Sequence, residues 1–321
     1  MLHFATQLTS FVTRRLAGLL LPLESEFSIA SLVSALCVAT VYIVLTRRPG
    51  KRAFNFRVIM RALFPSWLYR NPSFRVDVFL LLANALAFST LIGWASVSSA
   101  FISRKIAVSA TSAFGPVAGP GLQGLPGAAV VTIFIFIAYE LGYWIDHYLS
   151  HRVPLLWEFH KVHHTAEVLS PLTNFRVHPV DSIVFANIVG VSIGVTEGVL
   201  GFMKIGTQPG VTVNLLAVAF MWTLGHLQHS HIWIATTGLL GRVILSPAHH
   251  QIHHSENPKH FNKNFGSFIS TWDWMFGTLH MPTGRREHLS FGVGEPASQE
   301  HTLVGSILMP FVSAWKAVRH N

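Results

Sequence analysis

The sequence predicts an all-α, integral-membrane helical bundle that carries a histidine-rich metal site on its cytoplasmic side. Half of the 321 residues are hydrophobic and only 12% are charged, which sets the chain apart from soluble globular proteins. Several apolar runs are long enough to cross a bilayer as helices. The 19 histidines outnumber the 14 carboxylates, and 13 of them lie between His147 and His254.

The first predicted span is the apolar run from Phe27 to Leu45, and the second extends from Val76 to Ile102. Residues 1–23, which precede them, are compatible with an interfacial helix or a weak signal sequence. The loop between the two spans carries eight basic residues: Arg47, Arg48, Lys51, Arg52, Arg57, Arg61, Arg70 and Arg75. Because Lys and Arg are enriched in cytoplasmic loops, we expect this loop to lie in the cytoplasm.

Glycine and proline punctuate residues Phe114 to Gly127, which predicts a loop on the outer side. A third span, Ala128 to about Ile145, returns the chain to the cytoplasmic side. The runs Ile183–Met203 and Val211–Leu224 are separated by a short turn, and the second run is short for a full crossing. We therefore predict a membrane-embedded hairpin with both ends on one face. The expected divisions are an N-terminal membrane region (1–125), a catalytic region (126–285) and a C-terminal tail (286–321).

The net charge of +9 suits anionic lipid headgroups and topology control, because the basic residues lie beside apolar runs. Nucleic-acid binding is the poorer interpretation. The single cysteine, Cys37, excludes an internal disulfide framework and a cysteine-based metal site. We expect an inner or plasma membrane protein whose metal ligands are nitrogen or oxygen atoms.

Four groups of histidines recur in the second half of the chain. His147 and His151 stand at positions i and i+4, so a helix presents both on one face. The other groups are His160, His163 and His164; His226, His229 and His231; and His250, His253 and His254. Within the second and fourth groups the adjacent pair can spread towards two metal ions. The predicted topology places all four groups at the same membrane face.

Eight or more imidazoles exceed what one tetrahedral zinc ion requires, so two metal ions are the simplest interpretation. Imidazole binds iron, zinc and copper, and the spacing alone does not identify the element. A proton relay or structural network is the alternative to a metal site. A zinc-dependent membrane hydrolase is a rival function, although no His-Glu-x-x-His motif is present. A histidine-rich metal-binding membrane protein, acting as a carrier or sensor, is a second rival.

The order of these histidine groups is similar to that of the fatty acid hydroxylase and sterol desaturase superfamily. The resemblance extends to Ser246-Pro247 before the last group and Ser255 after it. Three further motifs carry it: Asn174-Phe175-Arg176-Val177-His178-Pro179-Val180-Asp181, Lys263-Asn264-Phe265-Gly266, and Trp272-Asp273-Trp274-Met275-Phe276-Gly277-Thr278. It covers about Ala128 to Pro282.

The resemblance implies a di-iron centre that uses dioxygen and two external electrons to hydroxylate or desaturate a lipid, with zinc as an occupant of purified protein. Carried over by position, the catalytic metal ligands are His147, His151, His160, His163, His164, His229, His250, His253 and His254. His178 and His226 are expected as additional ligands or as partners of ligands. His231 and His249 are equally compatible with ligand and supporting roles.

The resemblance also implies a fatty acyl, sterol or aminolipid substrate. No His-Pro-Gly-Gly segment typical of cytochrome b5 is present, so we expect the electron donor to be a separate cytochrome b5- or ferredoxin-type protein. The carboxylates of Asp146, Glu158 and Asp181 are candidates to accept N–H bonds from ligand histidines. Each is equally compatible with a solvated charge at the level of the lipid headgroups.

Overall fold

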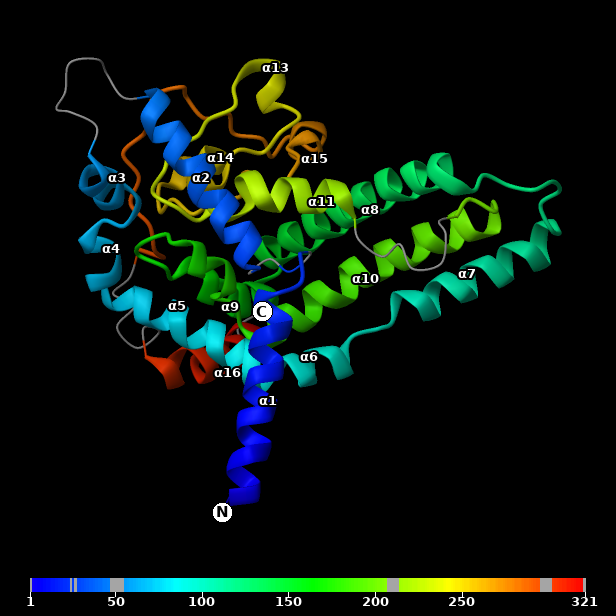
Figure 1. Cartoon of the computed structure of the whole chain (residues 1–321), viewed down its shortest axis with the longest axis horizontal. Coiled ribbons are helices and arrows are strands. Elements are labelled where there is room, and N and C mark those ends of the chain that lie inside the picture. Colours follow the sequence, from blue (N-terminus) through cyan, green and yellow to red (C-terminus); the bar gives the residue numbers. More distant parts are fainter. Residues whose placement is uncertain are drawn as a thin grey trace.

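All regular secondary structure in the described residues is helical. The computed structural model describes residues 2–23, 25, 28–46, 55–206, 214–294 and 302–319, and these residues form no β-strand (Figure 1). The all-α prediction is confirmed. Four of the eight basic residues in the predicted cytoplasmic loop lie outside the described residues: Arg47, Arg48, Lys51 and Arg52.

Among the described residues, four helical segments are long and apolar enough to cross a membrane: α2 (Ile29–Thr46), Pro72–Phe114, α8 (Gly124–Arg152) and α10 (Pro179–Phe202). Large apolar side chains are exposed on their outer faces, including Ile133 and Phe134 of α8 and Val191 and Val195 of α10. A soluble protein rarely exposes so much contiguous apolar surface. The chain is therefore a membrane protein.

The second span differs from its prediction, because it is bent and longer. It consists of α5 (Pro72–Ala83), the π-helical η1 (Asn84–Phe88), α6 (Ser89–Ala95) and α7 (Ser99–Phe114). The helix breaks between Ala95 and Ser99, where the Asn187 side chain of α10 accepts a hydrogen bond from Val97 N (2.9 Å) and donates one to Ala95 O (3.2 Å). This amide replaces the helical hydrogen bonds that the break removes.

Helices α7, α10 and α8 lie side by side as a layer that projects away from the histidines (Figure 1). Gly194 and Gly198 allow α10 to approach α7 closely, because a Cβ atom at either position would lie 2.7 Å from a backbone oxygen of α7. At the far end of this layer, Leu122 pairs with Ile205. The loop between the second and third spans therefore lies beside the turn of the hairpin.

The predicted hairpin has two helical arms, and its position in a membrane stays a prediction. Its first arm is α10, and its second arm is the shorter apolar helix Leu215–Gln228, made of α11 (Leu215–Phe220), the π-helical η3 (Met221–Gly225) and α12 (His226–Gln228). Residues 207–213 of the turn lie outside the described residues. Because α10 begins after His178 and α12 begins at His226, both ends of the hairpin open towards the histidines.

Ten further helices complete the described part of the fold, and the first of them projects away from the bundle (Figure 1). They are α1 (Leu2–Leu20), α3 (Phe56–Leu63), α4 (Ser66–Arg70), α9 (Pro154–His164), η2 (Pro171–Phe175), α13 (Gly238–Gly241), α14 (Pro247–His253), η4 (Pro258–His260), α15 (Thr271–Met275) and α16 (Leu303–Arg319). The C-terminal α16 packs against α9, with the rings of Phe311 and Phe159 5.2 Å apart.

A buried ion pair joins the N-terminal region to the histidine-bearing region. Arg176 and Asp77 of α5 are completely buried, and their Nη1 and Oδ1 atoms lie 3.0 Å apart. The same guanidinium donates to Val162 O of α9 and to the hydroxyl of Thr165. Buried charges are stable only when they are paired and hydrogen-bonded, so this pair fixes α5 against the end of α9.

Candidate metal centre

Four short stretches of helix bring the histidines together. The first pair lies in the last two turns of α8, and the second group lies on α9, which begins at Pro154 in the first helical turn. His229 follows α12 directly. The fourth group lies on and just after α14, whose start is fixed by a reciprocal capping box between Ser246 and His249.

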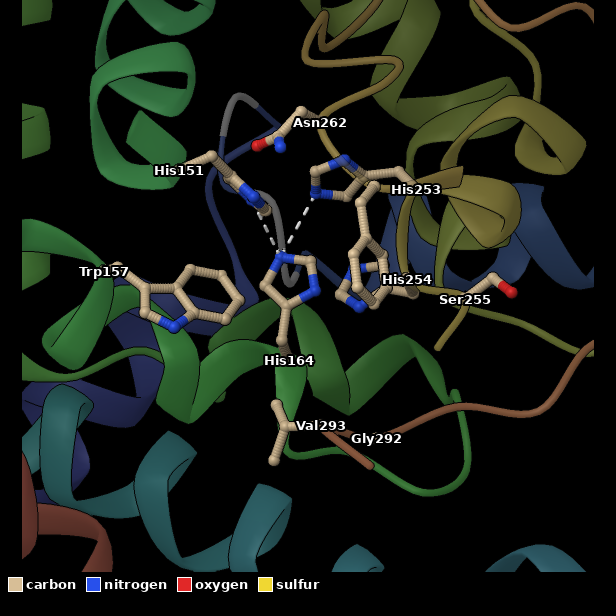
Figure 2. Close-up of a pocket in the computed structure, with 10 residues that line it drawn as sticks. His151, Trp157, His164, His253, His254, Ser255, Asn262, Gly292 and Val293 are labelled. Atoms are coloured by element: carbon tan, nitrogen blue, oxygen red, sulfur yellow. Dashed lines mark hydrogen bonds between the residues drawn. The ribbon is translucent and has the colours of Figure 1, made fainter. Parts of the chain in front are cut away.

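Nine of these histidines form two groups, in each of which one ring nitrogen per residue lies within 4.8 Å of all the others. The first group is His147, His151, His160, His164 and His253. His164 Nε2 lies 3.1 Å from His151 Nε2 and 3.2 Å from His253 Nε2, and Figure 2 shows its ring between the other two.

The second group is His163, His229, His250 and His254. His229 lies at its centre, because its Nε2 atom is 2.9 Å from that of His250 and 3.1 Å from those of His163 and His254. A single imidazole proton can serve only one of these three contacts. The arrangement is therefore not a simple hydrogen-bond network.

The adjacent histidine pairs divide between the two groups. His163 belongs to the second group and His164 to the first, whereas His253 belongs to the first and His254 to the second. Helices α9 and α14 thus each contribute to both groups, which fixes the two groups side by side.

Four of the 13 histidines from His147 to His254 lie outside both groups. His178 caps α10, accepts from Val180 N and contacts Ile307 O at 3.0 Å. His226 Nε2 lies 3.1 Å from the hydroxyl of Ser31 on α2. His231 donates to Ala62 O at 2.7 Å, and His249 is held by Ser246. The structure therefore does not bring His178 or His226, both expected as ligands or partners of ligands, into a group.

Three histidines of the first group are oriented through Nδ1. His147 donates to Phe265 O (2.8 Å), His253 to Lys263 O (2.8 Å) and His160 to Asp181 Oδ2 (3.1 Å). Each bond fixes the ring so that Nε2 faces the group. Asp181 was expected in this role. Glu158 was not correctly predicted, because its carboxylate pairs with Lys161 at 2.9 Å, and Asp146 Oδ1 has no hydrogen-bond partner among the described residues.

The carbonyl groups of Lys263 and Phe265 belong to one loop. The sequence did not identify Asp273, the residue that holds this loop in place. The carboxylate of Asp273 accepts hydrogen bonds from Phe265 N, Gly266 N, Trp144 Nε1 and Thr278 Oγ1. Asn264, at φ 59°, donates to His249 O. The Lys263–Gly266 and Trp272–Thr278 motifs include these residues, but the sequence indicated their importance only through the family resemblance.

Burial keeps these imidazoles neutral. Desolvation, followed by repulsion from neighbouring imidazoles, lowers the pKa of His229 to about 3. Desolvation likewise lowers the pKa of His253 to about 3, and it lowers the pKa of His163, His164, His250 and His254 well below the usual value. Neutral imidazole is the form that binds a metal ion.

These shifts predict that the metal-free protein loses stability in acid. Above pH 6.5 neither state binds protons at these histidines. Between pH 6.5 and about 3, the unfolded chain binds protons that the folded chain does not, at up to about 1.4 kcal/mol per pH unit for each residue. The Tm of the metal-free protein should therefore fall as the pH is lowered from 7 to 5, as measured by thermal unfolding in detergent. A Tm that stays constant over this range would contradict neutral burial.

The donor set fits a pair of metal ions. The buried Nε2 atoms of His147 and His160 have no hydrogen-bond partner among the described residues, although both rings are anchored through Nδ1. Two nitrogen ligands about 2.1 Å from an ion are about 3.0 Å apart at right angles and about 3.4 Å apart at a tetrahedral angle. The shortest nitrogen separations, 2.9 to 3.2 Å, match the right angle, and all the donor atoms of each group lie within 4.8 Å of one another.

A cavity of about 300 Å³ opens onto the first group. Figure 2 shows His151, His164 and His253 on one side of it and Trp157 and Val293 on other sides. Of the second group, His254 also lines this cavity. Small molecules from outside can therefore reach imidazoles of both groups from this side.

The comparisons with known proteins agree with this geometry. Residues 132–278 match the fatty acid hydroxylase family. This segment therefore resembles the fatty acid hydroxylase superfamily. The matched segment contains all nine grouped histidines and Asp273, whereas α2, α5 and α16 lie outside it.

Several curated proteins are similar to the fatty acid hydroxylase segment. Alkylglycerol monooxygenase of Danio rerio is 28% identical, over 45% of this chain and 29% of its own length. Ornithine lipid hydroxylase OlsE of Rhizobium tropici is 29% identical, over 49% and 44%. Human cholesterol 25-hydroxylase is 27% identical, over 46% and 50%. The chain thus spans half or less of the length of these relatives, and no solved structure matches it significantly.

Proposed function

We propose that this protein is a membrane-bound di-iron oxygenase that hydroxylates or desaturates a lipid C–H bond with dioxygen and two external electrons. The observation that carries the proposal is the pair of buried, neutral imidazole groups within the fatty acid hydroxylase segment. The similar proteins are named for hydroxylation or desaturation of ether lipids, ornithine lipids and sterols, which supports a fatty acyl, sterol or aminolipid substrate.

The proposed ligands are the nine grouped histidines, five for one iron and four for the other. Bound iron would supply the electron transfer that dioxygen requires. Hydroxylation consumes one dioxygen, two electrons and two protons, and yields an alcohol and one water. Desaturation consumes the same reactants and yields an alkene and two waters. We leave His178 and His226 outside the ligand set, because their ring nitrogens engage Ile307 O and the Ser31 hydroxyl.

The chain's own residues hold and insulate the reacting centre. The carbonyls of Lys263 and Phe265 and the carboxylate of Asp181 keep three ligand rings in one orientation. Burial of the imidazoles keeps them neutral. The arrangement therefore offers fixed, uncharged nitrogen donors at ordinary pH.

We further propose that the centre faces the cytoplasm of an inner or plasma membrane. The exposed basic residues Arg57, Arg61, Arg70 and Arg75 lie on α3, α4 and α5, which surround the histidine-bearing end of the bundle (Figure 1). A basic loop at that end favours the cytoplasmic side. A separate cytochrome b5- or ferredoxin-type protein would deliver the two electrons.

Metal analysis and oxygen uptake test the function. The purified protein is expected to contain about two irons per chain and, once reduced, to consume oxygen only when a lipid is added. Lipids from cells with and without the gene should differ by the gain of one oxygen or the loss of two hydrogens. Stoichiometric zinc with activity under anaerobic conditions would favour the rival hydrolase instead.

A further inference from the structure

A second cavity lies between α2, the α3–α4 region and the His226–Ile232 segment. It has a volume of about 410 Å³, within the range of about 300–1,000 Å³ typical of ligand pockets. Helix α2 forms one wall and α3 with α4 forms another. None of the nine grouped histidines lines it, so it is distinct from the cavity described above.

The chemistry of this cavity suits a hydrocarbon chain. Its α2 wall is lined by Leu32, Ala35, Leu36 and Ala39, and the facing wall includes Leu63 and Leu68. Ala35 and Ala39 are almost fully buried and stand one turn apart, so their small side chains leave a channel along α2. An alkyl chain that enters this channel from the bilayer would exchange contacts with other lipid chains for contacts with these apolar side chains.

The entrance to the cavity has the features of a membrane surface. Tyr69 and Phe64 line it and remain 53% and 45% exposed. On α3 the exposed apolar side chains of Phe56, Val58 and Met60 alternate with exposed Arg57 and Arg61. Such a short amphipathic helix lies in the headgroup region. Together with Arg70, which follows Tyr69, these arginines favour a negatively charged headgroup.

The inner end of the cavity reaches the segment that carries His229. His226, Leu227, Ser230 and Ile232 line it, and His229 of the second group lies between them in sequence. Hydrogen-bonding contacts tie both walls to this segment, because His226 meets Ser31 of α2 at 3.1 Å and His231 donates to Ala62 O of α3 at 2.7 Å. An alkyl chain in the cavity would therefore end against the segment that carries His229.

We propose that this cavity binds one alkyl chain of the lipid substrate, with an anionic headgroup held near Arg57, Arg61 and Arg70. The assignment of the chain as substrate rests on the proposed function. The binding of an alkyl chain does not rest on the proposed function, because it follows from the shape and lining of the cavity alone. The two parts can therefore be tested separately.

Binding is tested with a phosphatidylglycerol whose acyl chain carries a diazirine, added to the full-length protein in nanodiscs. Light should attach the probe to peptides from α2, α3–α4 and residues 226–232. Ala39→Phe fills the channel and should reduce this labelling at least about tenfold. Val41→Phe is the matched control, because Val41 lies on the same helix, is 56% exposed and does not line the cavity. Phosphatidylcholine bearing the same chain should label more weakly.

A second pair of variants guards against misfolding of the first. Leu36 lines the cavity and is 40% exposed, whereas Val33 is 53% exposed and does not line it. Leu36→Trp should reduce labelling and Val33→Trp should not. In both blocked variants, kcat/KM should fall more for long-chain than for short-chain substrates, while bound iron stays unchanged.

The possible outcomes distinguish binding of an alkyl chain in the cavity from oxidation of a lipid at the metal centre. Labelling outside these peptides, or equal labelling in Leu36→Trp and Val33→Trp, would overturn the binding site even if lipid oxidation is observed. Lost labelling with unaltered turnover would overturn the assignment of the chain as substrate. Specific labelling of a protein that oxidises no lipid would leave the cavity in place and refute the proposed function.

Discussion

Replacing His229 with alanine is expected to remove iron from the second group and to abolish lipid oxidation without preventing membrane insertion. Its Nε2 atom lies within 3.1 Å of three other ring nitrogens, so it is the central donor of that group. Loss of a residue that merely supports a ligand costs about 10–100-fold in metal affinity or activity. Loss of the ligand itself should lower turnover by more than about 100-fold.

The measurement is iron per chain together with oxygen uptake in protein extracted from membranes. His288→Ala is the control, because His288 is exposed and lies outside both groups. The control should retain iron and activity. Normal iron content and turnover in His229→Ala would refute the ligand assignment for the second group.

Replacing Asp273 with alanine should weaken metal binding from outside the ligand set. Its buried carboxylate accepts four hydrogen bonds, two of them from the backbone of Phe265 and Gly266. The variant leaves these donors unsatisfied, at about 1–3 kcal/mol each. The loop that presents the carbonyls of Lys263 and Phe265 would shift, and His147 and His253 would lose their anchors. We expect a fall of about 10–100-fold in metal affinity.

Iron retention during dialysis against a chelator measures this effect. Asp273→Asn is the graded comparison, because it keeps one acceptor oxygen and should lose less iron than Asp273→Ala. Thermal unfolding should show both variants destabilised in the same order. If Asp273→Ala retains iron as firmly as the unaltered protein, the loop does not position the ligands.

The histidine spacing predicted the meeting of distant stretches but not their exact grouping. Imidazoles at positions i and i+4 share a helical face whatever the tertiary structure is, so His147 with His151 could be placed from sequence. The partners of His229 could not, because they depend on how α12 packs against α9 and α14. The same limit applies to His226, whose contact with Ser31 requires α2 beside α12.

Supporting residues were harder to identify than ligands. Asp181 was identified, but Glu158 was misjudged because a lysine three residues away on the same helix competes for its carboxylate. The roles of the Lys263 and Phe265 backbone carbonyls could not be predicted, because every residue has a carbonyl and the side-chain pattern does not show which one accepts a hydrogen bond. The bend at residues 96–98 was missed for a similar reason, since it depends on the amide of Asn187 about 90 residues later.

The Asp77–Arg176 pair has a consequence for biosynthesis. The two residues are 99 positions apart, so α5 leaves the ribosome long before the guanidinium that compensates its carboxylate has been made. Completion of the membrane-inserted fold must therefore wait until the stretch after α9 has been translated. A gene fragment limited to residues 132–278, which match the fatty acid hydroxylase family, would lack Asp77. The guanidinium of Arg176 would then be buried without its carboxylate partner. Recombinant production should accordingly begin upstream of Pro72.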